Sequence, residues 1–384
     1  MRINRIELFE LTLPLLEPFI ISGGAITERR SLVVALHDEE GHVGYGESPP
    51  FELPFYSEET LGGARLLLAE LLIPRLLGLE VASPEAVDQL LRAGVRGNPF
   101  ARAALETAAW DLEAHRRGRG LAALLGERLG LVPAPAIPCG VALGIPQDRS
   151  TRTLRRWIET AVASGYRRVK IKVAPGWDVV PVGAAREALA GTDLPLTVDA
   201  NGSYEWPEHE AALRSLDEAG LLYFEQPLPP DDLIGHVRLS QTLRTPVCVD
   251  ETLRDARVAR YLLELNGPRV WNLKVHRVGG LSEVCRIVRV ATERHAALWA
   301  GTMPESGLGS QAALAAASLP GFVYPSDLEP SARWFGPGAD VIDLTMSPEG
   351  WMQVPGTSIS GLLDRDRLEA ASRRVLSVEA GRAR

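Results

Sequence analysis

The clearest indication of the fold begins with the segment Arg167-Arg168-Val169-Lys170-Ile171-Lys172-Val173. From here on, short apolar runs return at regular distances, and five of them end in a charged residue. The charged residues are 27, 26, 25 and 24 positions apart and comprise Lys172, Asp199, Glu225, Asp250 and Lys274. A βα unit of a parallel barrel takes about this many residues, since about 250 residues make eight units. The spacing therefore predicts five consecutive barrel strands that each deliver a charged group.

Further apolar runs on both sides bring the expected number of barrel strands to eight. They lie near residues 139–143, 168–173, 195–200, 222–226, 246–250, 270–275, 296–300 and 321–325. Because amphipathic segments alternate with these runs, we expect parallel pairing, right-handed crossovers and a closed (β/α)8 barrel of the TIM type. The strands of such a barrel all end at one mouth, where these folds carry their active sites.

Residues 1–131 predict a separate α+β domain. Three alternating segments indicate a small antiparallel sheet at 2–13, 31–37 and 43–47. Ser57 is placed to cap a first helix, and Asn98 with Pro99 is placed to open a second one.

The boundary between the two domains is expected in residues 132–138. Three prolines in this stretch exclude both a helix and a central strand. The barrel is therefore predicted for residues 132–339. Residues 340–384 read as irregular and then as helical at 365–376, and we expect them to return to the first domain.

The composition excludes several classes of protein. The 384 residues exceed what one compact core normally holds, which agrees with two domains. A net charge of -8, from 41 Lys+Arg and 49 Asp+Glu, argues against a nucleic-acid partner. Three scattered cysteines fit a reducing compartment. Because neither a signal peptide nor a membrane-spanning run is found, we expect a cytoplasmic protein without a membrane partner.

Lys170 and Lys172 are two positions apart on the second predicted barrel strand and therefore share one face. The apolar residues between and beside them take the other face, which should meet the surrounding helices. Both lysines then lie inside the barrel, where two ammonium groups lower each other's pKa and one lysine can act as a base. The alternative is a basic strand exposed to solvent.

Asp199, Glu225 and Asp250 end three adjacent predicted strands. Each alone fits a helix N-cap or a loop charge, but three carboxylates packed together repel one another unless a cation neutralises them. Oxygen ligands without histidine or cysteine indicate Mg²⁺ or Mn²⁺ rather than Zn²⁺. We expect Asn201 to reach this site and Glu251 to support it from behind the ligands.

Lys274 ends the sixth predicted strand, which lies opposite the second in a ring of eight. A lysine is thus expected on each side of the cavity, with the predicted metal site between them. If the metal holds a substrate carboxylate, one lysine can remove the α-proton, and the other can protonate the opposite face or assist a leaving group. The sequence therefore predicts an enzyme that acts on a small-molecule carboxylate.

The sequence resembles the enolase superfamily and, within it, the muconate-lactonizing subgroup. The similarity is greatest to the branch of o-succinylbenzoate synthases and N-acylamino-acid racemases, and it is densest between Gly165 and Gly280. Its motifs are Lys170-Ile171-Lys172, Asp199-Ala200-Asn201, Glu225-Gln226-Pro227, Asp250-Glu251 and Asn272-Leu273-Lys274. The resemblance implies the modified barrel of that superfamily with an α+β capping domain, and we also expect a homo-oligomer.

The resemblance also implies roles for single residues. Mg²⁺ or Mn²⁺ would be bound by Asp199, Glu225 and Asp250. Lys172 and Lys274 would be the acid and the base, and Lys170 would tune Lys172. Two capping loops near 18–26 and 49–57 would close the mouth and bring Phe19 and Tyr56 to the distal end of the substrate.

The seventh strand departs from the pattern of the branch. It is followed by Gly301-Thr302-Met303-Pro304-Glu305-Ser306-Gly307-Leu308-Gly309-Ser310, where the branch usually has Gly-Gly-Met-Leu-Glu and then Gly-Ile-Gly-Arg. Glu305 fits either the orientation of a base or the cap of the next helix. Together with Ser306 it belongs to the wall that contacts the substrate.

The constellation leaves the reaction open. We expect dehydration of 2-succinyl-6-hydroxy-2,4-cyclohexadiene-1-carboxylate to o-succinylbenzoate, racemisation of N-succinyl or other N-acylamino acids, or both. A dipeptide epimerase and a muconate-type cycloisomerase use a similar frame and stay alternatives. Alternatives of a different class are a Schiff-base aldolase, which also uses a barrel lysine, and a barrel that binds a ligand without catalysis.

Overall fold

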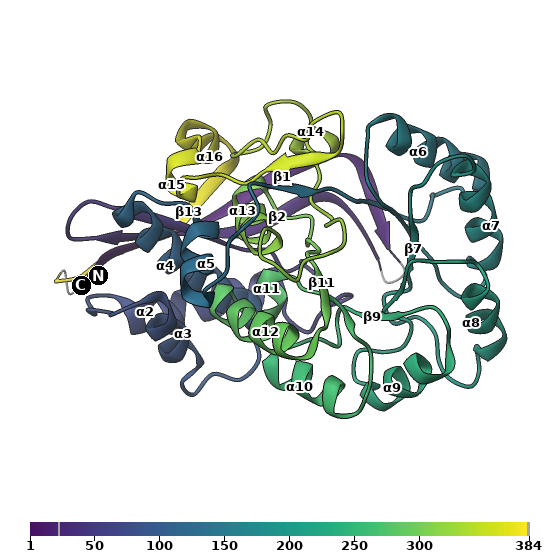
Figure 1. Cartoon of the computed structure of the whole chain (residues 1–384). Helices are drawn as coiled ribbons and strands as arrows, with labels where there is room; N and C mark the ends of the chain where they lie inside the picture. The colour runs from purple at the N-terminus through teal and green to yellow at the C-terminus, as the bar shows by residue number, and fades with distance from the viewer. Residues whose placement is uncertain (22–23, 382–384) are drawn as a thin grey trace.

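The computed structural model describes residues 1–21 and 24–381, and it contains an antiparallel sheet beside a parallel barrel-like sheet (Figure 1). The antiparallel sheet has the order β13-β1-β2-β3. Its strands are β1 (Ile3–Ile21), β2 (Gly24–Asp38), β3 (Val43–Ser48) and β13 (Ser372–Glu379). The α/β fold class with an α+β capping domain is therefore confirmed.

The hairpin of β1 and β2 is longer than the sequence pattern predicts. The two strands lose register between Pro14 and Phe19 and pair again from Phe19 and Ile26 onward. Figure 1 shows this hairpin leaving its sheet and extending across the barrel. It thereby brings part of the first domain to the barrel mouth.

Six helical segments accompany the antiparallel sheet. They are α1 (Leu61–Leu67), the π-helix η1 (Leu68–Leu72), α2 (Ile73–Leu76), α3 (Pro84–Arg92), α4 (Pro99–Arg117) and α5 (Leu121–Leu129). The predicted cap of the first helix is wrong: Thr60, not Ser57, accepts the hydrogen bond from the Gly63 amide. A threonine next to the first turn is better placed to satisfy a free amide of that turn.

Helix α4 begins at Pro99 as predicted, although the Asn98 side chain makes no cap hydrogen bond. The helix packs against β3 because two glycines of β3 let the backbones approach. A Cβ at Gly46 would lie 2.1 Å from the Ala104 carbonyl oxygen, and one at Gly44 would lie equally close to that of Ala108. Larger residues at these two positions are incompatible with this packing.

The barrel sheet has seven parallel strands in the order β11-β10-β9-β8-β7-β6-β5. Their bounds are β5 (Val141–Leu143), β6 (Val169–Lys172), β7 (Leu196–Asp199), β8 (Phe224–Glu225), β9 (Val247–Val249), β10 (Val270–Asn272) and β11 (Ala297–Trp299). The prediction of a regular eighth strand at 321–325 is wrong. This strand is represented by isolated parallel bridges, Leu298 with Phe322 and Cys139 with Ser326. These bridges connect the two edges of the sheet and close the ring.

Helices cover the outside of this ring (Figure 1). They are α6 (Thr151–Ala163), α7 (Val179–Ala188), α8 (Glu210–Asp217), α9 (Leu233–Thr242), α10 (Ala256–Glu264), α11 (Val275–Val278), α12 (Leu281–Arg294), α13 (Gly307–Ala317) and α14 (Ser331–Trp334). Val169 and Ile171 of β6 belong to the large hydrophobic core, while Lys170 and Lys172 alternate with them. The alternation turns both lysines toward the interior of the barrel.

The chain returns to the first sheet at its end. β12 (Trp351–Gln353) pairs with β4 (Ala136–Pro138), and α15 (Ile359–Leu362) and α16 (Arg365–Ala371) follow. β13 then pairs with β1. The predicted helix at 365–376 therefore ends early, because its second half is taken up by the sheet. The domain bounds 1–131, 132–339 and 340–384 stay a prediction.

Candidate active site

The five charged residues of the predicted register lie at one end of the parallel sheet. Lys172, Asp199 and Glu225 are the last residues of β6, β7 and β8. Lys172 is in register with Asp199, which is in register with Glu225. Asp250 directly follows β9, and Lys274 follows β10 after one further residue. All five side chains are buried.

Each of the three carboxylates is paired with an ammonium group. The Nζ atom of Lys172 lies 2.5 Å from Asp199 Oδ2, and that of Lys274 lies 2.9 Å from Asp250 Oδ2. Lys170 Nζ donates to Glu225 Oε2 at 2.8 Å. The buried charges are thus balanced within the mouth, as burial in a low-dielectric interior requires.

These three are the only lysines of the chain, since every other residue among its 41 Lys+Arg is an arginine. An arginine keeps its proton under all ordinary conditions, whereas a lysine can release it. The chain therefore carries lysine only at the mouth of the barrel. This signal is visible in the sequence, and reasoning from strand register overlooked it.

The predicted lowering of the lysine pKa is wrong for Lys170. Burial lowers its pKa, but Asp327, Glu225 and Asp199 together outweigh burial and hold the pKa well above its ordinary value. Asp327 Oδ2 lies 2.6 Å from Lys170 Nζ. Lys170 is consequently a fixed cation, because repulsion between neighbouring lysines is weaker than attraction to three carboxylates.

The donor set fits a hard divalent cation. Burial and the neighbouring Asp199 raise the pKa of Glu225, and Lys170 offsets only part of this rise. Asp250 Oδ1 is buried and accepts no well-aligned hydrogen bond from the described residues, although Arg277 Nη2 lies 3.0 Å away. Closely packed carboxylate oxygens with spare lone pairs are the ligands that Mg²⁺ and Mn²⁺ prefer.

A second acidic group lies in the turn between β2 and β3. Ligand atoms of Asp38, Glu40 and His42 approach within 4.8 Å of one another. Arg116 already contacts the carboxylates of Asp38 and Glu40, each at 3.2 Å. This turn is held by its own ion pairs, and none of them involves one of the three lysines.

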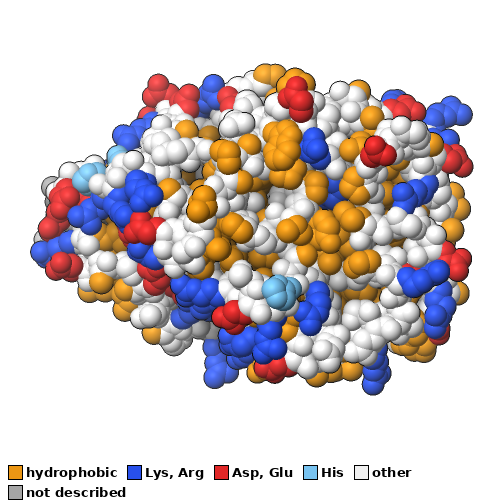
Figure 2. Space-filling view, in the orientation of Figure 1, with side chains coloured by type: hydrophobic (Ala, Val, Ile, Leu, Met, Phe, Trp, Pro, Cys, Tyr) orange, Lys and Arg blue, Asp and Glu red, His pale blue; other side chains and the backbone are white. Residues whose placement is uncertain are grey.

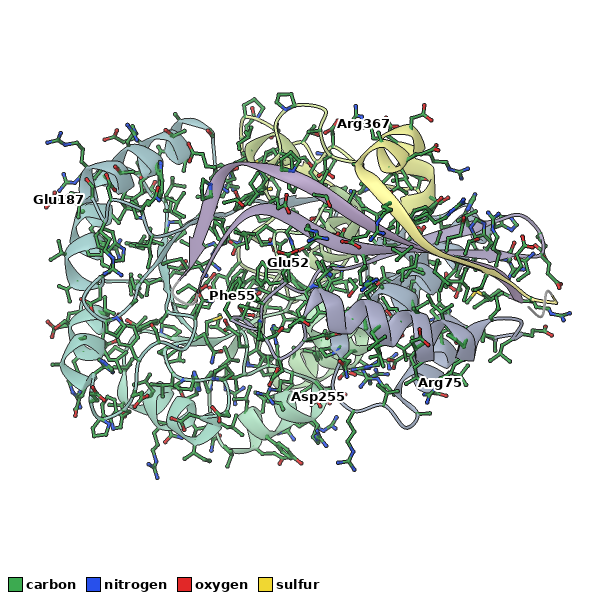
Figure 3. The ribbon with its side chains drawn as sticks, turned by 180° about the vertical axis from the view of Figure 1, so that it is seen from behind. Glu52, Phe55, Arg75, Glu187, Asp255 and Arg367 are labelled. Atoms are coloured by element: carbon green, nitrogen blue, oxygen red, sulfur yellow. The ribbon has the colours of Figure 1, made fainter. Side chains whose placement is uncertain are left out.

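The capping residues Phe19 and Tyr56 both reach the mouth. The Tyr56 hydroxyl accepts a hydrogen bond from Lys274 Nζ at 2.8 Å and donates one to Asp250 Oδ2 at 3.3 Å. Phe19 meets Trp334 edge to face, with 5.1 Å between ring centroids. Phe55, which Figure 3 labels, packs with Ile26 of β2 in one apolar cluster. Residues 22 and 23 of the predicted loop 18–26 lie outside the described residues.

Asn201 and Glu251 form a chain of hydrogen bonds behind the lysine. Asn201 Oδ1 accepts from Lys172 Nζ at 2.7 Å, and its Nδ2 donates to Glu251 Oε1 at 2.9 Å. The Asn201 amide also donates to Asp199. Asn201 thus fixes the ammonium and the carboxylate relative to each other.

Glu305 and Ser306 lie at the junction of barrel and capping domain. Glu305 Oε2 accepts from the Met303 amide at 2.5 Å, and its other oxygen is 3.8 Å from His276 Nδ1. Ser306 Oγ donates to Glu47 of β3 at 2.5 Å. Neither residue contacts one of the three lysines through a hydrogen bond or ion pair in the described structure. Both hold the loop after β11 in place.

Several residues of the site were missed by reasoning from the sequence. Asn272 Nδ2 donates to Glu225 Oε1 at 2.7 Å, and alternation with Lys274 on the same strand end could have indicated it. Asp327 and Glu329 follow the segment that closes the ring, and both line the cavity. Trp334 has no such signal, because α14 reaches the mouth only through tertiary packing.

A cavity of about 40 Å³ joins these groups. Its walls include the three lysines together with Asn201, Tyr56 and Phe19. The two lysines from opposite sides of the ring therefore face one space. An arrangement of this kind can remove a proton from one face of a bound molecule and return it to the other.

Comparison with known proteins agrees with this geometry. The family model described as "Enolase C-terminal domain-like" matches residues 153–358. The model of the mandelate racemase / muconate lactonizing enzyme N-terminal domain matches residues 5–126. Both parts of the fold thus have counterparts in one group of enzymes.

Relatives cover nearly the whole chain. An N-succinylamino acid racemase of Thermus thermophilus is 42% identical over 356 residues, which are 92% of this chain and 93% of the relative. An o-succinylbenzoate synthase of Enterococcus faecalis is 36% identical and covers 96% and 97% of the two chains. The solved structure of a probable mandelate racemase from Alicyclobacillus acidocaldarius is 37% identical, has a TM-score of 0.87 and covers 98% and 99%.

Proposed function

The chain is an enzyme that belongs to the mandelate racemase / muconate lactonizing enzyme family of the enolase superfamily, and on this premise we propose that it abstracts the α-proton of a carboxylate substrate. The observation that carries the proposal is the pair of lysines, Lys172 and Lys274, which line one cavity from opposite sides of the ring. Three buried carboxylates lie between them along the sheet.

Asp199, Glu225 and Asp250 would hold Mg²⁺. When bound, this ion supplies a Lewis acid that stabilises negative charge on the substrate carboxylate. Lys172, as a free amine, takes the α-proton while the electron pair of the broken C–H bond moves onto the carboxylate. Asn201 orients the Lys172 amine toward the cavity through the 2.7 Å hydrogen bond.

The role of the second lysine, Lys274, differs between racemisation and dehydration. In racemisation, the Lys274 ammonium returns a proton to the opposite face of the α-carbon. In dehydration, Lys172 returns its proton to the leaving hydroxyl as the C–O bond breaks, and Lys274 stays a cation beside the developing charge. Burial lowers the pKa of Lys274, but Asp250 and Tyr56 more than offset this and raise it, which suits a proton donor.

The substrate we propose is an N-succinyl or other N-acylamino acid, the precursor of o-succinylbenzoate, or both. Relatives named for each reaction are 36–42% identical to this chain over most of its length. Both reactions need the same base and the same metal ligands. A Schiff-base aldolase would give no role to the three buried carboxylates that lie between Lys172 and Lys274 along the sheet.

The test is α-proton exchange in ²H₂O with Mg²⁺ present. N-succinyl-L-phenylalanine and its D-enantiomer are followed by NMR and polarimetry, and dehydration of the cyclohexadiene carboxylate is followed by absorbance. We expect Lys172→Ala to lose exchange of one enantiomer and Lys274→Ala to lose exchange of the other. If both variants still exchange both enantiomers, neither lysine is the base, and the proposal fails.

Two further predictions stay untested. We expect a homo-oligomer, which sedimentation can check, and a cytoplasmic location, which fractionation can check. No helix in the described part of the chain is both long and apolar enough to cross a membrane.

A further inference from the structure

A larger cavity of about 640 Å³ lies beside the active-site cavity. It is bounded by the outer face of β5, by α6, by residues 16–19 of the hairpin and by α14. Figure 2 shows hydrophobic side chains gathered between charged ones on one face of the molecule. We call the cavity of about 640 Å³ the second cavity.

The two cavities share a wall. Phe19 and Trp334 line both of them, and their rings meet edge to face at an interplanar angle of 83°. The backbone of β5 also separates the two spaces, because Ala142 faces the active site while Val141 and Leu143 face the second cavity. Phe19 and Trp334 are thus the side chains that the linings of the two cavities have in common.

The active-site cavity is too small for the proposed substrates. Its volume of about 40 Å³ has room for roughly one water molecule. Sites for small organic ligands generally have about 300 to 1,000 Å³. The second cavity falls in that range and has room for the distal part of an acylated substrate.

The lining of the second cavity defines what it can hold. Leu143, Ile145 and Tyr166 are buried apolar surfaces, and Trp157 adds a half-buried ring. Two guanidinium groups and the exposed carboxylate of Glu17 accompany them. Arg333 is paired with Glu329, whereas Arg156 has no ion pair with any described residue. This combination fits an apolar chain that ends in an anion.

We propose that the second cavity receives the distal acyl group of the substrate, an apolar chain that ends in a carboxylate, and that Phe19 and Trp334 part to admit it. The inference rests on the proposed function for the identity of the substrate. It assigns the acyl chain to the apolar lining and its terminal carboxylate to Arg156. The amino-acid end stays between Lys172 and Lys274.

The first test fills part of the second cavity with a larger side chain on α6. Thr160 lines the second cavity and is exposed, so Thr160→Trp adds bulk there without disturbing the core. Ala163→Trp is the matched control, because Ala163 is an exposed residue of the same helix and is not part of the lining. The ligands are N-succinyl- and N-acetyl-phenylalanine, and calorimetry in the presence of Mg²⁺ measures their binding to each variant.

We expect Thr160→Trp to weaken binding of the N-succinyl ligand about tenfold and to change binding of the N-acetyl ligand less than about twofold. Ala163→Trp should alter neither. Equal losses for both ligands, or no loss for either, would overturn the proposal. Because calorimetry does not need turnover, a selective loss in a protein without α-proton exchange supports the cavity and contradicts the proposed reaction.

The charge test uses Arg156→Gln, with Arg152→Gln on the same helix as the control. Arg152 is exposed and does not line the cavity. We expect Arg156→Gln to weaken binding of N-succinyl-phenylalanine about fivefold, and to leave binding of its neutral succinamide analogue within about twofold. An equal effect of Arg152→Gln would show a general loss of surface charge and would contradict the assignment of the carboxylate to Arg156.

Discussion

At the floor of the barrel mouth each ammonium group is paired with a carboxylate from another strand, whereas at its distal wall two aromatic rings meet edge to face. The floor comprises Lys170, Lys172, Asp199, Glu225, Asp250 and Lys274. The distal wall comprises Phe19 and Trp334, which also line the second cavity. Ion pairs in a buried place require fixed partners, but an aromatic contact can open at a small cost. The floor thus suits chemistry, and the wall suits selection of the substrate.

We expect the largest effect from Lys172→Arg, a substitution that keeps the positive charge of the floor. A guanidinium cannot give up its proton, so we expect α-proton exchange to fall roughly 10³-fold or more. Isotope exchange with N-succinyl-phenylalanine measures it. As a control, the thermal stability of Lys172→Arg must equal that of the parent protein. Exchange near the parental rate would show that Lys172 contributes positive charge to the floor and does not act as a base.

The next largest effect is expected from Asp199→Asn and Glu225→Gln. Each removes one anionic oxygen donor, and we expect activity to fall roughly 10²-fold together with Mg²⁺ binding. Calorimetric titration with Mg²⁺ checks the binding. Asp38→Asn is the control, because its cluster lies in the turn after β2. If Asp38→Asn abolishes the Mg²⁺ signal while Asp199→Asn keeps it, the metal site has been assigned to the wrong acidic group.

Tyr56→Phe tests the contact between the capping loop and the floor. The variant keeps the ring but loses the hydroxyl between Lys274 and Asp250, which lies 2.8 Å from the ammonium. A hydrogen bond to a charged group is worth about 1.5–3 kcal/mol, so we expect kcat to fall about tenfold. Steady-state kinetics measure the change. Tyr261→Phe, at an exposed tyrosine of α10, should have no effect.

The smallest effect is expected outside both regions, at Glu7 of β1. A hydrogen bond from His37, together with Arg5 and Arg374, outweighs burial and lowers the pKa of Glu7 from 4.5 to about 2. The resulting stability is fully present above pH 4.5 and is lost as the pH falls from 4.5 to 2. Glu7→Gln should therefore destabilise by about 1 kcal/mol at pH 7 and by less at acid pH. Urea unfolding at several pH values measures this, and a constant difference would contradict it.

The register of strand ends could be predicted from the sequence because each barrel strand ends at the same mouth. This applies to Lys172, Asp199 and Glu225, which close β6, β7 and β8. The eighth strand could not be predicted in detail. Its apolar pattern at 321–325 is that of a strand, but the segment forms only isolated bridges. Apolar alternation indicates burial, and it does not fix the number of ladder hydrogen bonds.

The pKa of Lys170 is a second property that could not be predicted from the sequence. Its neighbour Lys172 is visible in the sequence, but Asp327 lies 157 positions away and Glu225 lies 55 away. These two carboxylates contact Lys170 at 2.6 and 2.8 Å and determine its charge. A pKa depends on all charges within a few ångströms, whatever their distance along the chain.

The barrel, the charged residues at five of its strand ends and the restriction of lysine to the mouth could all be inferred from the sequence. These are local properties, since strand period, alternation and residue type follow from neighbours along the chain. The contact between Tyr56 and Lys274, and the position of Phe19 and Trp334 between two cavities, depend on how the chain folds in space. Such contacts join segments far apart in the sequence, and no periodicity records which of them will meet.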